Sequence, residues 1–124
     1  MSPIKVLVVD DDMINRKLMA AMLKKNPKVG EIIEANDGQE AIQKMREEGD
    51  VGLVLLDLIM PVMGGIEVLQ IMHSDPTLKK IPVIVLTTDE SKKSEALNNG
   101  ANDFIAKPIR ETELTQKIDR LVAL

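Results

Sequence analysis

Carboxylate side chains come directly after two short apolar segments of the sequence. Asp10 and Asp11 follow residues 4–9, and Asp57 follows residues 51–56. Carboxylates are ligands that Mg²⁺ prefers in proteins, and an aspartate can also accept a phosphoryl group covalently. A single aspartate in such a place more often caps a helix or begins a turn. These residues therefore indicate chemistry only if other reactive groups lie beside them.

A threonine and a lysine follow two further apolar segments. Thr87 comes after residues 81–86, and Lys107 comes after residues 103–106. Taken singly, Thr87 fits an ordinary strand-end hydroxyl and Lys107 fits a solvated surface lysine. Crowded carboxylates repel one another unless cations lie nearby, and Mg²⁺ together with a lysine would suit an anion with several oxygens, such as a phosphoryl group.

The apolar pattern predicts five strands that alternate with five helices. Short unbroken apolar runs are typical of strands buried on both faces, whereas apolar stripes with a spacing of three or four residues are typical of helices. The predicted strands are residues 4–9, 31–35, 51–56, 81–86 and 103–106, and a helix follows each of them.

The first predicted helix has recognisable ends and an apolar stripe. Asp12 is a plausible N-cap, and Asn26 followed by a proline ends the helix. Ile14, Leu18 and Met22 recur every four residues, so we expect them to form the face that packs on the sheet.

Strict alternation of strands and helices predicts an α/β fold with a doubly wound parallel sheet. Parallel strands need right-handed crossovers, which place helices on both faces. A chain of 124 residues is too short for an eight-stranded barrel. Because the carboxyl ends of parallel strands share one edge of the sheet, we expect Asp10, Asp11, Asp57, Thr87 and Lys107 to converge there.

Length, charge and composition exclude several classes of protein. The 124 residues predict one domain over residues 1–124, with a net charge of −4 and no run of basic residues, which argues against nucleic acid or an anionic membrane as a partner. Cysteine is absent, so disulfides and thiolate metal sites are excluded, and a cytoplasmic location is expected. The first strand-to-helix turn contains no glycine, so a nucleotide-phosphate cradle is missing.

Four motifs together resemble the response-regulator receiver domains of two-component signalling. They are VLVVDDD at the first strand, DLIMPVMGG at the third, LTT at the fourth and GANDFIAKP around the fifth. The resemblance covers essentially the whole sequence, and the four motifs are specific only in combination. It implies a flavodoxin-like (βα)5 fold with strand order 2-1-3-4-5.

The resemblance also implies a role for each acid and for the lysine. Asp57 would accept a phosphoryl group from the phosphohistidine of a sensor histidine kinase or a phosphotransfer protein. Asp10, Asp11, Asp57 and the backbone carbonyl of Ile59 would hold Mg²⁺. Lys107 would pair with the acids and then with the phosphoryl oxygens.

Further residues would read out the phosphorylation. Thr87 and Thr88 would contact the phosphoryl group, and Thr87 with Phe104 would form the switch that alters the face made by the fourth helix, fifth strand and fifth helix. Phe104 is the only aromatic residue, and it could equally be plain core filler. The bond from Lys107 to Pro108 is typically cis in this family.

Three positions depart from the family pattern. Thr88 is larger than the usual Ala or Ser and could crowd the phosphoryl group. Gly64 stands where Asp is common, which weakens the N-terminal cap of the third helix. Phe104 lacks the hydroxyl of the Tyr found in some members.

Two other functions remain alternatives to a phosphorylation switch. Phosphatases of the haloacid-dehalogenase type also use Asp, Thr, Lys and Mg²⁺, but their DxDx[TV] pattern is not matched by DDDMI at residues 10–14. A degenerate receiver that only binds partners would have lost an acid, the Thr or the Lys, and all are present. We therefore expect a switch that modifies itself and has no turnover on external substrates. We expect the switch to act on a downstream protein target. We also expect the chain to be a monomer unless phosphorylation drives dimer formation.

Overall fold

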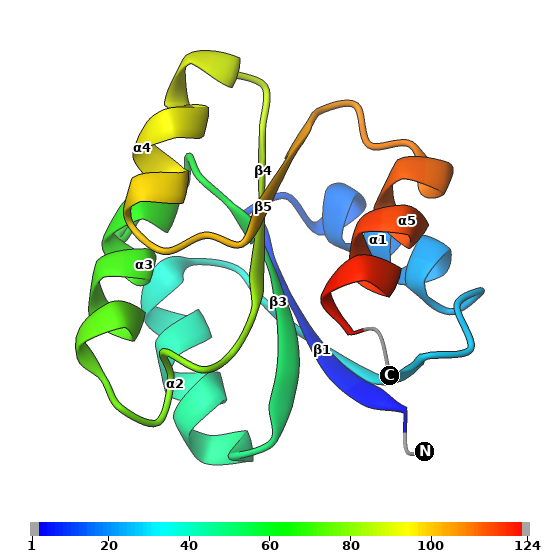
Figure 1. The fold of residues 1–124 in the computed structure, drawn as a ribbon, viewed down its shortest axis with the longest axis horizontal. Coiled ribbons are helices and arrows are strands. Elements are labelled where there is room, and N and C mark those ends of the chain that lie inside the picture. Colours follow the sequence, from blue (N-terminus) through cyan, green and yellow to red (C-terminus); the bar gives the residue numbers. More distant parts are fainter. Residues whose placement is uncertain (1–2, 123–124) are drawn as a thin grey trace.

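The computed structural model describes residues 3–122, which form one parallel sheet between two layers of helices (Figure 1). The two residues at each end of the predicted 1–124 domain lie outside the described range. In chain order the elements are β1 (Ile4–Val9), α1 (Met13–Leu23), β2 (Val29–Ala35), α2 (Gly38–Glu48), β3 (Val51–Asp57), α3 (Gly65–Ser74), β4 (Val83–Thr87), the 3-10 helix η1 (Glu90–Lys92), α4 (Lys93–Asn98), β5 (Asp103–Ala106) and α5 (Glu111–Leu121).

The five described strands pair in the order β2-β1-β3-β4-β5, and every pairing is parallel. This confirms the predicted doubly wound sheet. The chain runs outward from β1 to β2, then crosses back to β3, so the winding direction reverses between β1 and β3. Open α/β sheets hold their ligands at such a reversal, just beyond the carboxyl ends of the strands.

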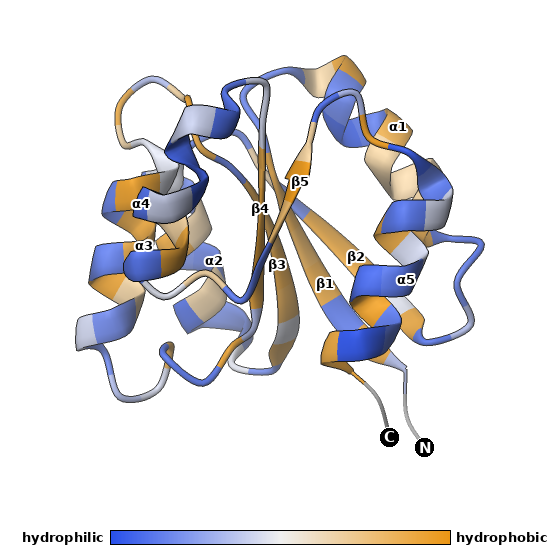
Figure 2. Ribbon diagram, turned by 45° about the horizontal axis from the view of Figure 1, so that its top comes forward, coloured by the Kyte–Doolittle hydropathy of each residue, from blue (hydrophilic) through white to orange (hydrophobic). Residues whose placement is uncertain are grey.

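Each strand of the sheet centre contributes to two hydrophobic cores, because successive side chains point to opposite faces. In β1, Leu7 and Val9 face the helices α2, α3 and α4, whereas Val6 and Val8 face α1 and α5. Figure 1 shows the two helix layers on either side of the sheet, and Figure 2 shows the largely hydrophobic strands between them. Burial on both faces explains why these strands read as unbroken apolar runs.

The predicted packing face of α1 is wrong for Ile14 and Leu18, whereas Met22, the third residue of that stripe, is partly buried against the core. Ile14 is 67% exposed and Leu18 is 57% exposed, whereas Met19 and Leu23 are buried against the sheet. Two apolar stripes with the same four-residue spacing run side by side on this helix, and spacing alone cannot tell which one meets the sheet. The predicted N-cap is confirmed, because Asp12 Oδ1 accepts a hydrogen bond of 2.8 Å from the backbone N–H of Ile14.

Three predicted boundaries also differ. β2 starts at Val29 and not at residue 31, because Val29 already pairs with the first residue of β1. β4 starts at Val83, since Pro82 has no N–H for the ladder and contributes only its carbonyl, which accepts from the N–H of Val54 at 3.0 Å. The predicted helix 91–98 is divided into η1 and a short α4.

The corrected face of α1 can be tested by truncating one residue from each stripe. Leu23→Ala should lower the free energy of unfolding by about 2–5 kcal/mol, because it leaves a cavity in the core. Leu18→Ala should change it by less than about 0.5 kcal/mol, since that side chain is mostly in solvent. Urea unfolding followed by circular dichroism would measure both, and equal losses would contradict this packing.

Candidate functional site

The polar residues at the strand ends converge at one edge of the sheet, as predicted. Asp10 follows β1, Asp57 ends β3, Thr87 ends β4 and Lys107 follows β5. Asp10, Asp57 and Thr87 are 1%, 6% and 1% exposed. The ammonium of Lys107 lies 3.0 Å from Asp10 Oδ2 and 3.4 Å from Asp57 Oδ1. Four elements that are distant in sequence therefore meet in a single charged cluster.

The acids of this cluster are close enough to share one metal ion. Asp10, Asp11 and Asp57 each offer a carboxylate oxygen, and the three oxygens lie within 4.8 Å of one another. Asp10 and Asp57 are buried, whereas Asp11 is exposed, so the cluster opens to solvent on one side. Hard oxygen donors with room for water suit Mg²⁺, which usually keeps several of its own waters. The residues present therefore fit the predicted cofactor.

Burial and neighbouring charges shift the pKa values of Asp57 and Lys107 in the charged cluster. Burial raises the pKa of Asp57, the ammonium of Lys107 opposes that rise, and the negative charge of Asp10 adds to it. For Lys107 burial acts to lower the pKa, but the hydrogen bond to Asp10 and the charge of Asp57 outweigh it, so its pKa is raised. Lys107 is therefore a permanent cation, while ionised Asp57 is held at a cost in energy.

The loop after β3 is held close to Asp57 by glycine. A Cβ atom on Gly65 would lie 2.6 Å from the carbonyl oxygen of Asp57, so only glycine allows α3 to start there. Gly64 gives α3 no side-chain cap, as predicted. Val62 has φ of 70°, which is strained for a β-branched residue, and it is 77% exposed. The side chain of Ile59 is 60% exposed, and its carbonyl as a metal ligand stays a prediction.

The predicted switch residues lie on one face of the sheet. Thr87 Oγ1 accepts a hydrogen bond of 3.1 Å from the N–H of Asp89. Phe104 pairs across the strands with Val85, two residues before Thr87, so both side chains point to the α4 side. The ring is 5% exposed, and the ammonium of Lys93 lies 5.9 Å from its centre.

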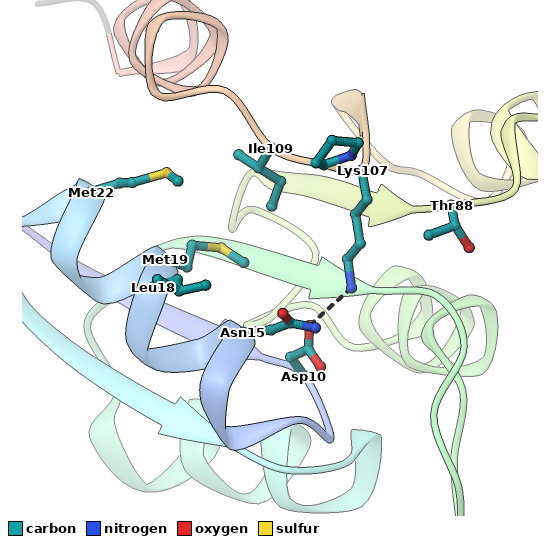
Figure 3. Close-up of a pocket in the computed structure, with 9 residues that line it drawn as sticks. Asp10, Asn15, Leu18, Met19, Met22, Thr88, Lys107 and Ile109 are labelled. Atoms are coloured by element: carbon teal, nitrogen blue, oxygen red, sulfur yellow. Dashed lines mark hydrogen bonds and ion pairs between the residues drawn. The ribbon is translucent and has the colours of Figure 1, made fainter.

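A cavity of about 420 Å³ adjoins the charged cluster between α1 and the segment after β5 (Figure 3). In Figure 3, Leu18, Met19 and Met22 of α1 face Ile109 across this cavity, and Lys107 reaches down to Asp10. Thr88 is exposed and lies at the opposite rim. The bond from Lys107 to Pro108 is cis, as expected.

One residue that contacts the cluster was not predicted from the sequence. Arg16 donates a hydrogen bond of 2.7 Å from Nη1 to the backbone carbonyl of Asp10. In the sequence, Arg16 is simply one of the basic residues of this helix that lie off the predicted apolar stripe. No local motif marks such a contact, because it depends on how α1 crosses the end of β1.

Comparison with known proteins decides the family. The family model described as "Response regulator receiver domain" matches residues 6–119. The chain belongs to this family. The chemotaxis protein CheY1 of Helicobacter pylori is 33% identical over 119 residues, which are 93% of this chain and 94% of that protein. The high-resolution structure of the chemotaxis response regulator CheY4 of Vibrio cholerae matches with a TM-score of 0.87 and 29% identity, over 98% of this chain and 100% of that chain.

Receiver domains also occur inside longer signalling proteins. The CAI-1 autoinducer sensor kinase/phosphatase CqsS of Vibrio cholerae is 38% identical over 117 residues, which are 92% of this chain but only 17% of that protein. The receiver resemblance and the order of the strands are thus confirmed, and the chain is a receiver domain of two-component phosphorelay signalling. Among residues 3–122, each helix is too short or too polar to cross a bilayer.

The raised pKa of Asp57 predicts how stability depends on pH without divalent cations. The protonated form of Asp57 favours the fold, and this contribution is lost as pH rises from the ordinary value of 3.8 through the folded-state pKa. Asp57→Asn should therefore be more stable than wild type at pH 7, and the difference should shrink as pH falls below 3.8. Thermal unfolding in a chelator across this range would measure it.

Asp75 provides a control for which the expected change in stability has the opposite sign. Its carboxylate accepts hydrogen bonds from the side chain and backbone of Thr77, which lower its pKa. Asp75→Asn should lower the stability at pH 7, and that loss should fade as pH falls. An Asp57→Asn variant that is less stable than wild type at pH 7 would show that Lys107 outweighs burial.

Proposed function

We propose that this receiver domain is a switch in which Asp57 accepts a phosphoryl group from the phosphohistidine of a sensor histidine kinase or a phosphotransfer protein. The observation that carries the proposal is the position of Asp57. Its carboxylate is buried, shares a site with two other acids and lies 3.4 Å from the ammonium of Lys107. A carboxylate held in this way is a nucleophile beside charges that suit a phosphoryl group.

In the proposed reaction an oxygen of Asp57 forms a bond to phosphorus while the bond from phosphorus to the donor imidazole breaks. The imidazole nitrogen takes that electron pair, and Asp57 becomes an acyl phosphate. Asp10, Asp11, Asp57 and the Ile59 carbonyl would hold Mg²⁺, which when bound supplies positive charge that offsets the phosphoryl and carboxylate charges.

The chain adds a positive charge of its own to that of Mg²⁺, namely the ammonium of Lys107. In the structure it pairs with Asp10 and Asp57. After the transfer, the Asp57 oxygen that carries phosphorus has lost its charge, and the ammonium is free to pair with a phosphoryl oxygen. Thr87 would donate its hydroxyl to a second phosphoryl oxygen, and Thr88 would contact the group from the rim. The product is the modified chain, so the step is not turnover of an external substrate.

A protein is the donor favoured by the surface around the site. Large apolar residues are exposed in the segments that follow the acids: Met13, Ile14, Leu18, Ile59 and Val62 are 57–77% exposed. Met13 and Ile14 begin α1 directly after the acidic turn, Leu18 lines the cavity beside the cluster, and Ile59 and Val62 lie in the loop that follows Asp57. Such side chains favour a partner that buries them, which a small phosphodonor cannot do. In the proposal, the chain is a monomer that contacts a kinase here and a downstream protein elsewhere.

The proposed output runs from Thr87 through the segment that leads into α4. Thr87 Oγ1 accepts from the N–H of Asp89, and the carboxylate of Asp89 accepts from the N–H of Ser91 at 3.0 Å. A phosphoryl oxygen that draws Thr87 inward would therefore pull on η1 and α4. Phe104, already buried beside Lys93, would be held in that position. The face formed by α4, β5 and α5 would change its population of conformations.

Phosphorylation itself is the direct test of the proposal. With Mg²⁺ and either acetyl phosphate or a phosphorylated histidine kinase, the wild-type chain should gain one acid-stable, base-labile phosphoryl group. Asp57→Asn should gain none, because the amide is not a nucleophile for this step. Intact-protein mass spectrometry before and after mild base would count the groups.

Two results would contradict this proposal. Equal labelling of Asp57→Asn would place the acceptor elsewhere. Sustained hydrolysis of p-nitrophenyl phosphate, with many turnovers per chain, would mark the site as that of a phosphatase.

The proposed output can be separated from the chemistry by Thr87→Ala. Beryllofluoride with Mg²⁺ mimics the phosphoryl group, and it should shift the backbone NMR signals of residues 91–117 in the wild type. Thr87→Ala should still be phosphorylated at Asp57, but these remote shifts should shrink because the contact to Asp89 is lost. Unchanged remote shifts in Thr87→Ala would refute the coupling while leaving Asp57 as the acceptor.

A further inference from the structure

We propose that Arg16 is a positioning residue for the metal-binding acids: its guanidinium fixes the peptide between Asp10 and Asp11 and so aims both carboxylates at one cation. This inference rests on the proposed function of the acid cluster. Arg16 itself touches neither Asp57 nor any group that would react.

Every polar atom of Asp10 has a partner, and each partner comes from a different part of the fold. Its N–H donates to the Ala35 carbonyl of β2 at 3.1 Å. Its Oδ1 accepts from the N–H of Asp12 at 2.9 Å, and its Oδ2 accepts from Lys107 at 3.0 Å. The remaining atom, the backbone carbonyl, accepts from Arg16 at 2.7 Å. Arg16 is thus the contact that completes the fixation of this residue.

The carbonyl of Asp10 matters because it lies in the same rigid plane as the N–H of Asp11. A peptide unit is planar, so a hydrogen bond to its oxygen fixes the orientation of the whole unit. That orientation sets the direction in which the backbone leaves Asp10 and therefore where the Asp11 side chain begins. Asp11 is exposed, so the packing around it holds it less firmly than Asp10.

Arg16 is itself held by a glutamate on the neighbouring strand. Its Nε donates to Glu34 Oε1 at 3.0 Å, while Lys17 Nζ donates to Glu34 Oε2 at 2.8 Å. Glu34 pairs with Val8 in the sheet, which places it on the α1 side. The planar guanidinium can contact Glu34 and the Asp10 carbonyl together, because its donors point in fixed directions. The side chain of Arg16 is only 15% exposed, whereas that of Lys17 is 64% exposed.

Simple electrostatics and positioning predict opposite effects when Arg16 is removed. A cation close to the acids competes with Mg²⁺, so the loss of its charge should strengthen metal binding. If Arg16 orients Asp10 and Asp11, its loss should weaken metal binding instead. Lys17 is a matched control, because it is the next residue, carries the same charge and binds the same glutamate, but forms no hydrogen bond or ion pair with Asp10.

The test is to measure Mg²⁺ affinity of the full chain by isothermal titration calorimetry, without any phosphodonor. Arg16→Met should bind Mg²⁺ about tenfold more weakly than wild type, a typical effect of removing a group that orients metal ligands. Lys17→Met should bind it as well as wild type or slightly better. Arg16→Lys keeps the charge but not the planar fork, so its affinity should fall between those of wild type and Arg16→Met.

A second measurement tests the orientation of the peptide between Asp10 and Asp11 directly. The residual dipolar coupling of the Asp11 amide, measured before Mg²⁺ is added, should change in Arg16→Met and not in Lys17→Met, because only the first releases the peptide plane. Should Arg16→Met fail to fold, the same comparison between Arg16→Lys and Lys17→Met decides the inference. Glu34→Gln should weaken binding less than Arg16→Met, since Arg16 still reaches Asp10.

The outcomes separate this inference from the proposed function. Arg16→Met and Arg16→Lys that bind Mg²⁺ as tightly as Lys17→Met would overturn the role of Arg16. A wild-type chain that binds Mg²⁺ but gains no phosphoryl group on Asp57 would overturn the proposed function while leaving the Arg16 result intact. A wild-type chain that does not bind Mg²⁺ would overturn both.

Discussion

Mutual repulsion among three carboxylates at one edge of the sheet is the constraint on which the rest of the site depends. Asp10, Asp11 and Asp57 place oxygens within 4.8 Å of one another, and two of these acids are buried. Lys107 bonds to two of the three and so offsets only part of their charge. The cluster is therefore short of positive charge, which makes it receptive to a divalent cation and, with that cation, to a phosphoryl group.

The fold tolerates this repulsion because the surrounding backbone is rigid. Asp57 ends a strand at the sheet centre, paired with β1 on one side and β4 on the other. The glycine at position 65 brings α3 against the carbonyl of Asp57, where any Cβ would collide with backbone. Asp10 is fixed at each of its polar atoms. Repelling groups cannot move apart when their backbones are held in this way, so the repulsion stays available to drive binding.

The sequence predicts the sheet and the convergence of the site residues for one reason: the carboxyl ends of parallel strands always share an edge. Asp57, Thr87 and Lys107 could be placed together without knowledge of any side-chain geometry. The packing face of α1 could not be predicted, since Leu18 and Met19 belong to neighbouring stripes of equal spacing and only the crossing of the helix over the sheet selects one. The role of Arg16 could not be predicted for a similar reason: its contact spans a helix and a strand end that no motif links.

The same rigidity explains how a change at Asp57 could reach a distant face. A threonine hydroxyl has one hydrogen to donate and can also accept, and Thr87 already accepts from the N–H of Asp89. It can therefore bond a phosphoryl oxygen without giving up that contact. In the proposed output, movement of Thr87 would be passed through this hydrogen bond to Asp89, which caps η1, and so to α4, where Lys93 lies over the ring of Phe104. α4 spans only six residues and buries only Ala96, whereas α2 and α3 in the same layer are longer and bury four residues each, so we expect α4 to resist such a pull least.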